Sequence, residues 1–222
     1  MSKATALSTA QIKHVLKICN LMTHSEGKRC AIVLSHAALR VSEIARLQVK
    51  SVLYPSGDIK NEIHLPASIC KGLKSRTIWL TNKTSRKIIQ EWIDFRVAHR
   101  WGTMPFDENY QSLNPNSILL FNNRGKPYAL TEKNRTLIDG SIKSYRASDA
   151  LEHGIRDIYK KAGLHMASSH SGRKSMVTNS ILKQGRTLEQ LAQILGHDDA
   201  QTTLDYVDIN NARLIDMYEA GF

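Results

Sequence analysis

The chain has 222 residues, of which 31 are Lys or Arg and 20 are Asp or Glu, so its formal net charge is +11 with neutral histidines. Hydrophobic residues make up 41% and charged residues 23%, a composition that indicates a folded globular protein and excludes a disordered or fibrous one. No apolar run reaches the roughly 18 residues that a membrane span needs, and the first residues lead into no apolar signal core, so we expect neither a membrane protein nor a secreted one.

The positive charge favours a polyanionic partner, with nucleic acid first and an anionic membrane surface second. No block of Lys and Arg is longer than three residues, so the charge is spread over a folded surface and is not held in a tail. The three cysteines, Cys19, Cys30 and Cys70, include no Cys-x-x-Cys pair. Their number and spacing predict a reducing cytosol, without a disulfide framework or a thiolate metal site. Cys19 and Cys30 lie in apolar helical stretches and are predicted to be buried.

The N-terminal part of the chain is predicted to be helical. Ser8-Thr9-Ala10-Gln11 has the spacing of a capping box, and apolar residues at positions 12, 15, 16 and 19 follow it on one helical face. We expect a second helix over residues 28–39 and a short one over residues 42–47.

The pattern changes after a turn cluster at residues 54–58. Residues 62–65 and 77–80 are predicted to be short strands, and residues 70–76 between them form a basic hairpin tip. The expected fold is therefore a mainly α protein with a small three-stranded antiparallel β-sheet.

Helices are expected again from about residue 85 and over residues 151–162. Residues 132–148 are polar and lack a clear period, which predicts an exposed insert or a loose helix. Further helices are predicted to stop near Gly185, to begin at a second capping box at Thr187 and to flank Tyr206. With no repeat and no linker, residues 1–222 are expected to form a single domain that ends in a helical tail over 207–222.

Four short stretches carry the chemistry. They are ALRVSEIARL around Arg40, CKGLKSRTIWL around Lys71, SSHSGRKS around His170 and Arg173, and LGHDDAQTTLDYV around His197 and Tyr206. Their order and spacing resemble those of the tyrosine recombinases, the phage-integrase family. In that family an Arg begins a helix, a Lys lies on a β-hairpin, a His-x-x-Arg follows, and a His stands nine residues before the nucleophilic Tyr.

Cleavage of a phosphodiester places extra negative charge on the non-bridging oxygens of the phosphorus. Arginines match these oxygens with bidentate hydrogen bonds and stay charged, and positioned cations are a large catalytic effect. The resemblance assigns this clamp to Arg40 and Arg173. It implies that His170 and His197 donate to the same oxygens, and that one of them helps to remove the tyrosine proton.

The resemblance assigns the remaining chemistry to three side chains. Tyr206 is the nucleophile, and its phenol needs nearby positive charge or a base to become reactive. Lys71 protonates the leaving 5′ oxygen, with Lys74 as a rival for this role. Glu43, one helical turn after Arg40, orients the clamp. No metal, ATP or other cofactor is needed, because the phosphotyrosine bond keeps the energy of the broken linkage.

Taken one by one, these positions also have structural interpretations. An isolated Arg is usually a surface charge, a Lys on a hairpin is usually solvated, a His at a helix end often only complements the helix dipole, and a Tyr at helical spacing is usually a core residue. The joint order and spacing of all six positions favours the catalytic interpretation.

The expected partner is double-stranded DNA, bound by a homotetramer on paired sites in the cytoplasm, at the prokaryotic nucleoid, with accessory DNA-bending proteins. Phosphate contacts are predicted from basic residues that flank the motifs, although plain solvation explains Lys50 and Lys183 equally well. The predicted contacts are Lys50, Lys74, Arg76, Lys174 and Lys183.

Two features differ from many relatives. Only 39 residues precede Arg40, so a separate DNA-binding domain is not expected, and the chain is either a minimal recombinase or the catalytic part of a longer one. The tail has an apolar face and packs either on a neighbouring protomer or on its own domain. Two rival functions stay open: a relaxing topoisomerase of the related IB type and a non-catalytic DNA-binding regulator.

Overall fold

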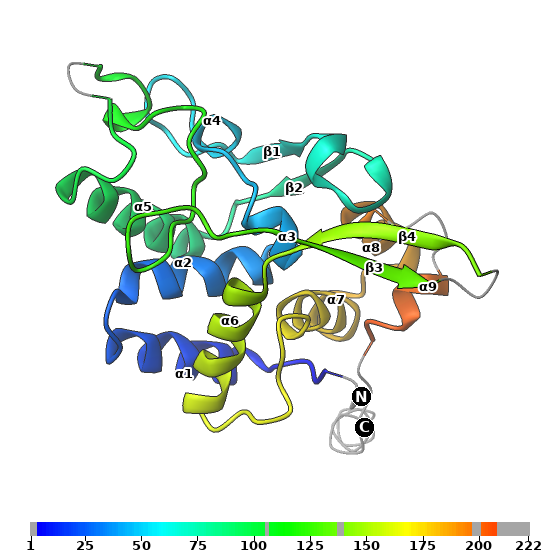
Figure 1. Cartoon of the computed structure of the whole chain (residues 1–222). Coiled ribbons are helices and arrows are strands. Elements are labelled where there is room, and N and C mark those ends of the chain that lie inside the picture. Colours follow the sequence, from blue (N-terminus) through cyan, green and yellow to red (C-terminus); the bar gives the residue numbers. More distant parts are fainter. Residues whose placement is uncertain (1–3, 105–106, 137–139, 197–200, 208–222) are drawn as a thin grey trace.

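The computed structural model describes residues 4–104, 107–136, 140–196 and 201–207 (Figure 1). Helices dominate these residues, and the strands form two small antiparallel sheets. The helices are α1 (Thr9–Asn20), α2 (Ser25–His36), α3 (Val41–Ile44), α4 (Val49–Val52), α5 (Lys83–Ala98), α6 (Asp149–Lys161), α7 (Ser171–Gln184), α8 (Leu188–Leu195) and α9 (Gln201–Leu204). The strands are β1 (Glu62–Leu65), β2 (Arg76–Trp79), β3 (Thr131–Thr136) and β4 (Ile142–Ala147), and short 3₁₀ turns lie at Ala67–Ile69, Lys71–Leu73 and Asn109–Ser112.

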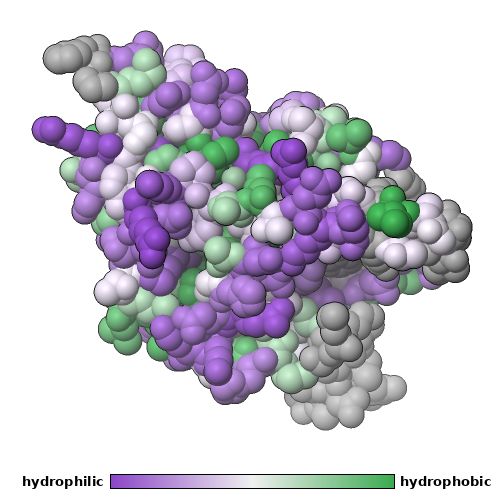
Figure 2. All heavy atoms as spheres, viewed as in Figure 1, coloured by the Kyte–Doolittle hydropathy of each residue, from purple (hydrophilic) through white to green (hydrophobic). Residues whose placement is uncertain are grey.

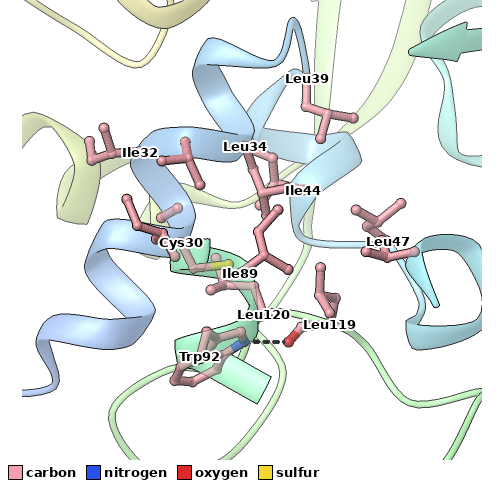
Figure 3. Packing of buried hydrophobic residues seen from close by; sticks show 14 of the residues in the cluster. Cys30, Ile32, Leu34, Leu39, Ile44, Leu47, Ile89, Trp92, Leu119 and Leu120 are labelled. Atoms are coloured by element: carbon pink, nitrogen blue, oxygen red, sulfur yellow. Dashed lines mark hydrogen bonds between the residues drawn. The ribbon is translucent and has the colours of Figure 1, made fainter. Parts of the chain in front are cut away.

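Helix α2 is the centre of the hydrophobic core and contacts α1, α5, α6 and α7. Its residues Cys30 and Leu34 are fully buried against Ile89 and Trp92 of α5 (Figure 3). The indole Nε1 of Trp92 donates a hydrogen bond of 2.8 Å to the carbonyl oxygen of Leu119, so the one polar atom of this large side chain is satisfied inside the core. The apolar packing of α2 thus supports the turn that follows it.

Both predicted capping boxes are confirmed. Ser8 Oγ accepts a hydrogen bond from the backbone N–H of Gln11, whose side chain accepts one from the N–H of Ser8, and Thr187 and Gln190 repeat the arrangement at α8. Helices α7 and α8 end at Gly185 and Gly196, which are left-handed, as expected for glycine at this position.

Helix α2 spans residues 25–36 and not the predicted 28–39. Its N-cap is His24, which makes no side-chain capping bond and therefore leaves no local signal for the start. At the other end Ala38 has a φ of 66°, a left-handed conformation that ends the helix before Leu39. Arg40 then adopts an extended conformation and begins α3.

Strands β1 and β2 confirm the predicted hairpin. They pair antiparallel with Leu65 opposite Arg76 and Ile63 opposite Ile78. Residues alternate between exposed and buried along each strand, which is the pattern of a two-stranded sheet with one face on a core. The connection between them contains two 3₁₀ turns, and Lys71 begins the second.

The prediction of a three-stranded sheet is wrong for the described residues, which form two separate two-stranded sheets. Segment 132–148 is not a loose helix: β3 and β4 pair along their whole length, from Thr131 opposite Ala147 to Thr136 opposite Ile142. The two segments are close in sequence and pair with each other locally. Most described side chains of this hairpin are exposed, so its sequence has no apolar alternation.

The β3–β4 hairpin extends from α6 past α3 toward α8 and α9 (Figure 1). Hydrophilic residues cover most of this face of the molecule, with apolar residues scattered among them (Figure 2). Such scattered apolar residues are normal for a protein surface. None of the helices in the described ranges has the length and apolar composition that a membrane crossing requires.

A second, smaller apolar cluster lies beside the main core. It consists of the buried residues Ala38, Val177, Leu191 and Leu195, and Tyr206 packs against it. The turn after α2, helices α7 and α8, and the segment after α9 therefore meet here. The helix predicted to follow Tyr206 and the tail over 208–222 lie outside the described residues.

Candidate active site

Arg40 is held by Glu43 at the start of α3. The backbone N–H of Arg40 donates to Glu43 Oε2 at 2.7 Å, and its Nη1 donates to Glu43 Oε1 at 3.0 Å. Its side chain is 18% exposed, so the guanidinium is oriented from behind and still reaches the surface. The structure thus contains the contact that the predicted supporting role of Glu43 requires.

Glu43 is completely buried and forms ion pairs with two arginines. Besides Arg40, Arg76 Nη2 lies 2.6 Å from Glu43 Oε2. Burial acts to raise the pKa of Glu43, but the charges of Arg76, Arg40 and Arg173 outweigh it and lower that pKa below its ordinary value. Glu43 is therefore a carboxylate at neutral pH and anchors the guanidinium groups around it.

Arg173 lies in the first turn of α7 and is only 1% exposed. Its Nη1 donates to the carbonyl oxygen of Ala38, and its Nη2 donates to that of Leu195 at 3.2 Å. Gly172 permits this position, because a Cβ there would lie 2.7 Å from the carbonyl oxygen of Ser35 at the end of α2. The side chain therefore bridges the turn before Arg40 and the end of α8.

Burial and the nearby charge of Arg40 lower the pKa of Arg173 to about 9, although Tyr206 and Glu43 act in the opposite direction. Arg173 is still cationic at neutral pH. Its Nε is buried and has no hydrogen-bond partner within the described ranges. An unpaired buried donor is costly, and Arg76 Nε is in the same state within those ranges.

Tyr206 lies next to this cation. The guanidinium carbon of Arg173 is 5.5 Å from the centre of the Tyr206 ring. Thr178 Oγ1 on α7 donates to the carbonyl oxygen of Tyr206 at 3.0 Å, and the N–H of Tyr206 donates to that of Thr203 at 2.9 Å. A tyrosine near the end of the chain is thereby fixed beside Arg173, and Arg173 binds the residue two positions before Arg40.

His170 is exposed at the start of α7, three positions before Arg173. Its backbone N–H donates to Ser168 Oγ at 3.3 Å. The other predicted histidine, His197, lies outside the described residues. Lys71 begins the turn Lys71–Leu73 on the β1–β2 connection, and its side chain is not among those that the structure describes.

The residues predicted to contact phosphate differ in how exposed they are. Lys74 and Lys50 are exposed, and Lys50 Nζ donates to Asn116 Oδ1 at 2.8 Å. Lys174 is buried, because it lies on the face of α7 that packs inward, and its phosphate contact stays a prediction. Lys183 is in α7, and its side chain is outside the description.

Arg76, another predicted phosphate contact, is buried as well. It is only 6% exposed, and its guanidinium is bound to Glu43 and to the carbonyl oxygens of Ala38 and Ile194. The structure therefore places Arg76 beneath the site and not on a DNA-facing surface. The strand pattern contained the signal for this position, since Arg76 shares its face of β2 with the buried Ile78.

Cys19 and Cys30 are buried, as predicted, and Cys70 is buried as well; all three are free thiols. Burial raises the pKa of each thiol, and for Cys19 it reaches about 11, so none of them is a reactive thiolate at neutral pH. In the part of the chain that the structure describes, no group of three or more His, Cys, Asp or Glu is placed to hold a metal ion.

Comparisons with known proteins identify the family of the chain. The model of the phage integrase family matches residues 5–213. The chain is 25% identical to tyrosine recombinase XerC of Herpetosiphon aurantiacus, over 97% of this chain and 60% of that protein. It is also 25% identical to tyrosine recombinase XerD of Oceanobacillus iheyensis, over 96% of this chain and 61% of that protein.

The fold is similar to that of solved recombinases. The crystal structure of XerA recombinase matches with a TM-score of 0.68 and 23% identity, over 97% of this chain and 64% of that chain. XerH site-specific recombinase, bound to a palindromic difH substrate, matches with a TM-score of 0.63 and 18% identity, over 96% and 52%. The chain thus spans about 60% of the length of the curated relatives it matches. Because the family model covers nearly its whole length, the chain belongs to the phage integrase family.

Proposed function

We propose that this chain is the catalytic part of a site-specific DNA recombinase that cuts and rejoins DNA through a 3′-phosphotyrosine at Tyr206. The observation that carries the proposal is the position of Tyr206 next to Arg173, which is itself tied to the turn that presents Arg40. These residues are far apart in sequence, and the fold gathers them around one buried cation.

The arrangement suits an in-line displacement at phosphorus. Arg40 and Arg173 hold the non-bridging oxygens while the phenol oxygen of Tyr206 attacks, with His170 and His197 as further donors to the same oxygens. The new bond joins phosphorus to the tyrosine oxygen, and the bond to the 5′ oxygen breaks. The phenol proton passes to a base, for which a histidine is suited, and Lys71 donates a proton to the 5′ oxygen.

Strand exchange follows when a different 5′ hydroxyl attacks the phosphotyrosine and releases Tyr206. The number of phosphodiester bonds is unchanged, so no ATP is required, and the arginines supply the charge stabilisation that a metal would otherwise give. Double-stranded DNA is the proposed substrate, and the net charge of +11 suits its phosphates. A homotetramer on two paired sites, accessory DNA-bending proteins and a location at the prokaryotic nucleoid belong to the same proposal.

The test is a covalent-capture assay. Nicked duplexes carrying candidate sites from DNA that flanks the gene trap the phosphotyrosine, because the cleaved end diffuses away. Tyr206→Phe should abolish adducts and spare DNA binding, whereas Tyr145→Phe, a change in an exposed tyrosine of the β3–β4 hairpin, should leave adducts unchanged. Adducts that persist in Tyr206→Phe would assign the nucleophile to another residue.

The same protein distinguishes the two rival functions. Relaxation of supercoiled DNA without a preferred site would favour the topoisomerase. Joining of two defined sites favours the recombinase. DNA binding without adducts from the unchanged protein would favour the non-catalytic regulator.

A further inference from the structure

We infer that Arg76 is a positioning residue, which locks the two clamp arginines and the β1–β2 hairpin into one rigid unit. This inference rests on the proposed function. Arg76 lies on β2, five positions after Lys71, and its guanidinium forms hydrogen bonds with three other parts of the site. Its partners come from the turn after α2, from α3 and from α8.

The first connection runs through Glu43 to Arg40. Glu43 Oε2 accepts from both the backbone N–H of Arg40 at 2.7 Å and Arg76 Nη2 at 2.6 Å, and Oε1 is left for Arg40 Nη1. Because Glu43 is fully buried, its carboxylate depends on both cations for its charge. Without Arg76, Oε2 would lose its charged donor and the carboxylate of Glu43 could rotate. Arg40 would then no longer be held in one orientation.

The second connection is a carbonyl oxygen that two arginines share. The oxygen of Ala38 accepts from Arg76 Nη2 at 2.9 Å and also from Arg173 Nη1. A carbonyl oxygen has two lone pairs, so both donors can be accommodated at once. The position of Arg76 therefore limits where Arg173 can lie.

The third connection is to the end of α8. Arg76 Nη1 donates to the oxygen of Ile194 at 2.7 Å, and Arg173 Nη2 donates to that of the next residue, Leu195. The last carbonyls of a helix lack partners within the helix and favour positive charge. Gly196 completes the contact, because a Cβ there would lie 2.8 Å from Arg76 Cδ. The two arginines thus hold the helix whose end leads directly to position 197.

The chain offers a matched control for a buried arginine. Arg96 is fully buried on α5, and its guanidinium donates to the backbone oxygens of Trp101, Ile118 and Leu119, away from the site. Arg76→Lys and Arg96→Lys each replace a planar group that makes several hydrogen bonds with one flexible ammonium. Both variants should have a lower melting temperature than wild type. If Arg76 has a purely structural role, the two variants should also form adducts at similar rates.

The experiment measures the rate of covalent adduct formation at a temperature where each variant is folded. Arg76→Lys should lower this rate by about 10–100-fold, the usual effect of residues that orient a site from behind, and Arg96→Lys by less than about twofold. The rates are then compared on a duplex with a methylphosphonate at the scissile position, which removes one negative charge from the phosphate. The Arg76→Lys defect should shrink on this substrate, because the clamp has less charge to hold.

A second pair of variants covers the case in which Arg76→Lys does not fold. Gly196→Ala and Gly185→Ala introduce the same left-handed strain at two helix ends, but only Gly196 lies against Arg76. Only Gly196→Ala should slow adduct formation by more than its loss of stability explains. Equal rates for folded Arg76→Lys and wild type, or an equal defect on both substrates, would overturn the positioning role. Absence of adducts with wild type would overturn the proposed function, and this inference with it.

Discussion

Two buried regions of this protein are held together in opposite ways. The core around α2 and α5 consists of apolar side chains such as Leu34, Ile89 and Trp92. The region under the site consists of Arg76, Arg173 and Glu43, all buried and joined by directional hydrogen bonds. Apolar packing needs only the right volume, whereas an ionic network requires each partner at its position. We therefore expect changes in the core to affect mainly stability, and changes in the network to affect both stability and the orientation of the site.

The largest expected change in stability comes from the core. Trp92→Ala should lower the free energy of unfolding by about 3–5 kcal/mol, because it leaves a cavity and removes the bond to the Leu119 carbonyl. Urea unfolding followed by circular dichroism measures this change. The rate of adduct formation should stay near that of wild type at temperatures where the variant is folded. A large rate defect in the folded variant would contradict the separation of the two regions.

Of the changes in the two buried regions, the largest expected change in activity comes from the network. Arg173→Lys should slow covalent adduct formation by about 10²–10³-fold, because an ammonium cannot replace a planar guanidinium at a developing phosphorane. Gel-shift binding to the same duplex should change little, since many surface charges contribute to affinity. A loss of binding as large as the loss of rate would show that Arg173 acts mainly on affinity.

Glu43→Gln tests the charge of the network. It should lower the free energy of unfolding by about 3 kcal/mol near pH 7, because Arg76 and Arg40 lose their carboxylate. The neighbouring arginines depress the pKa of Glu43, so its contribution is fully present above the ordinary value of 4.5 and is lost as the pH falls through the lower folded value. Unfolding at a series of pH values should therefore show the two proteins converging on acidification. A constant difference across this range would contradict the ionic role.

The smallest expected effects come from the two capping boxes, one of which lies on a helix that contacts the network. Thr187→Ala and Ser8→Ala each remove a capping box and should each cost about 1 kcal/mol of stability. Only the first change loosens α8, whose last carbonyls bind Arg76 and Arg173. Thermal unfolding and adduct rates together should show equal stability losses and a slower rate for Thr187→Ala alone.

Patterns of neighbouring residues predicted much of the fold. The capping boxes at Ser8 and Thr187, the strands around positions 62–65 and 77–80, and the buried stripe of α6 all depend on contacts within a few residues. The motif spacing also singled out Arg40, Arg173 and Tyr206, and the fold places both Tyr206 and the charge of Arg40 near Arg173.

The tertiary structure decided what lies between those motifs. The end of α2 at Ala38, the β3–β4 hairpin and the burial of Arg76 carry no strong local pattern, because the first depends on a left-handed residue, the second is polar and the third needs partners far away in sequence. A charge in a sequence favours the surface by default, and only the three-dimensional fold shows whether a carboxylate and carbonyl oxygens are placed to stabilise it inside. The sequence by itself predicted the residue types of the candidate site, and the packing of α2, α3, α7 and α8 decided that Arg76 and Arg173 are buried beside Glu43 whereas Arg40 reaches the surface.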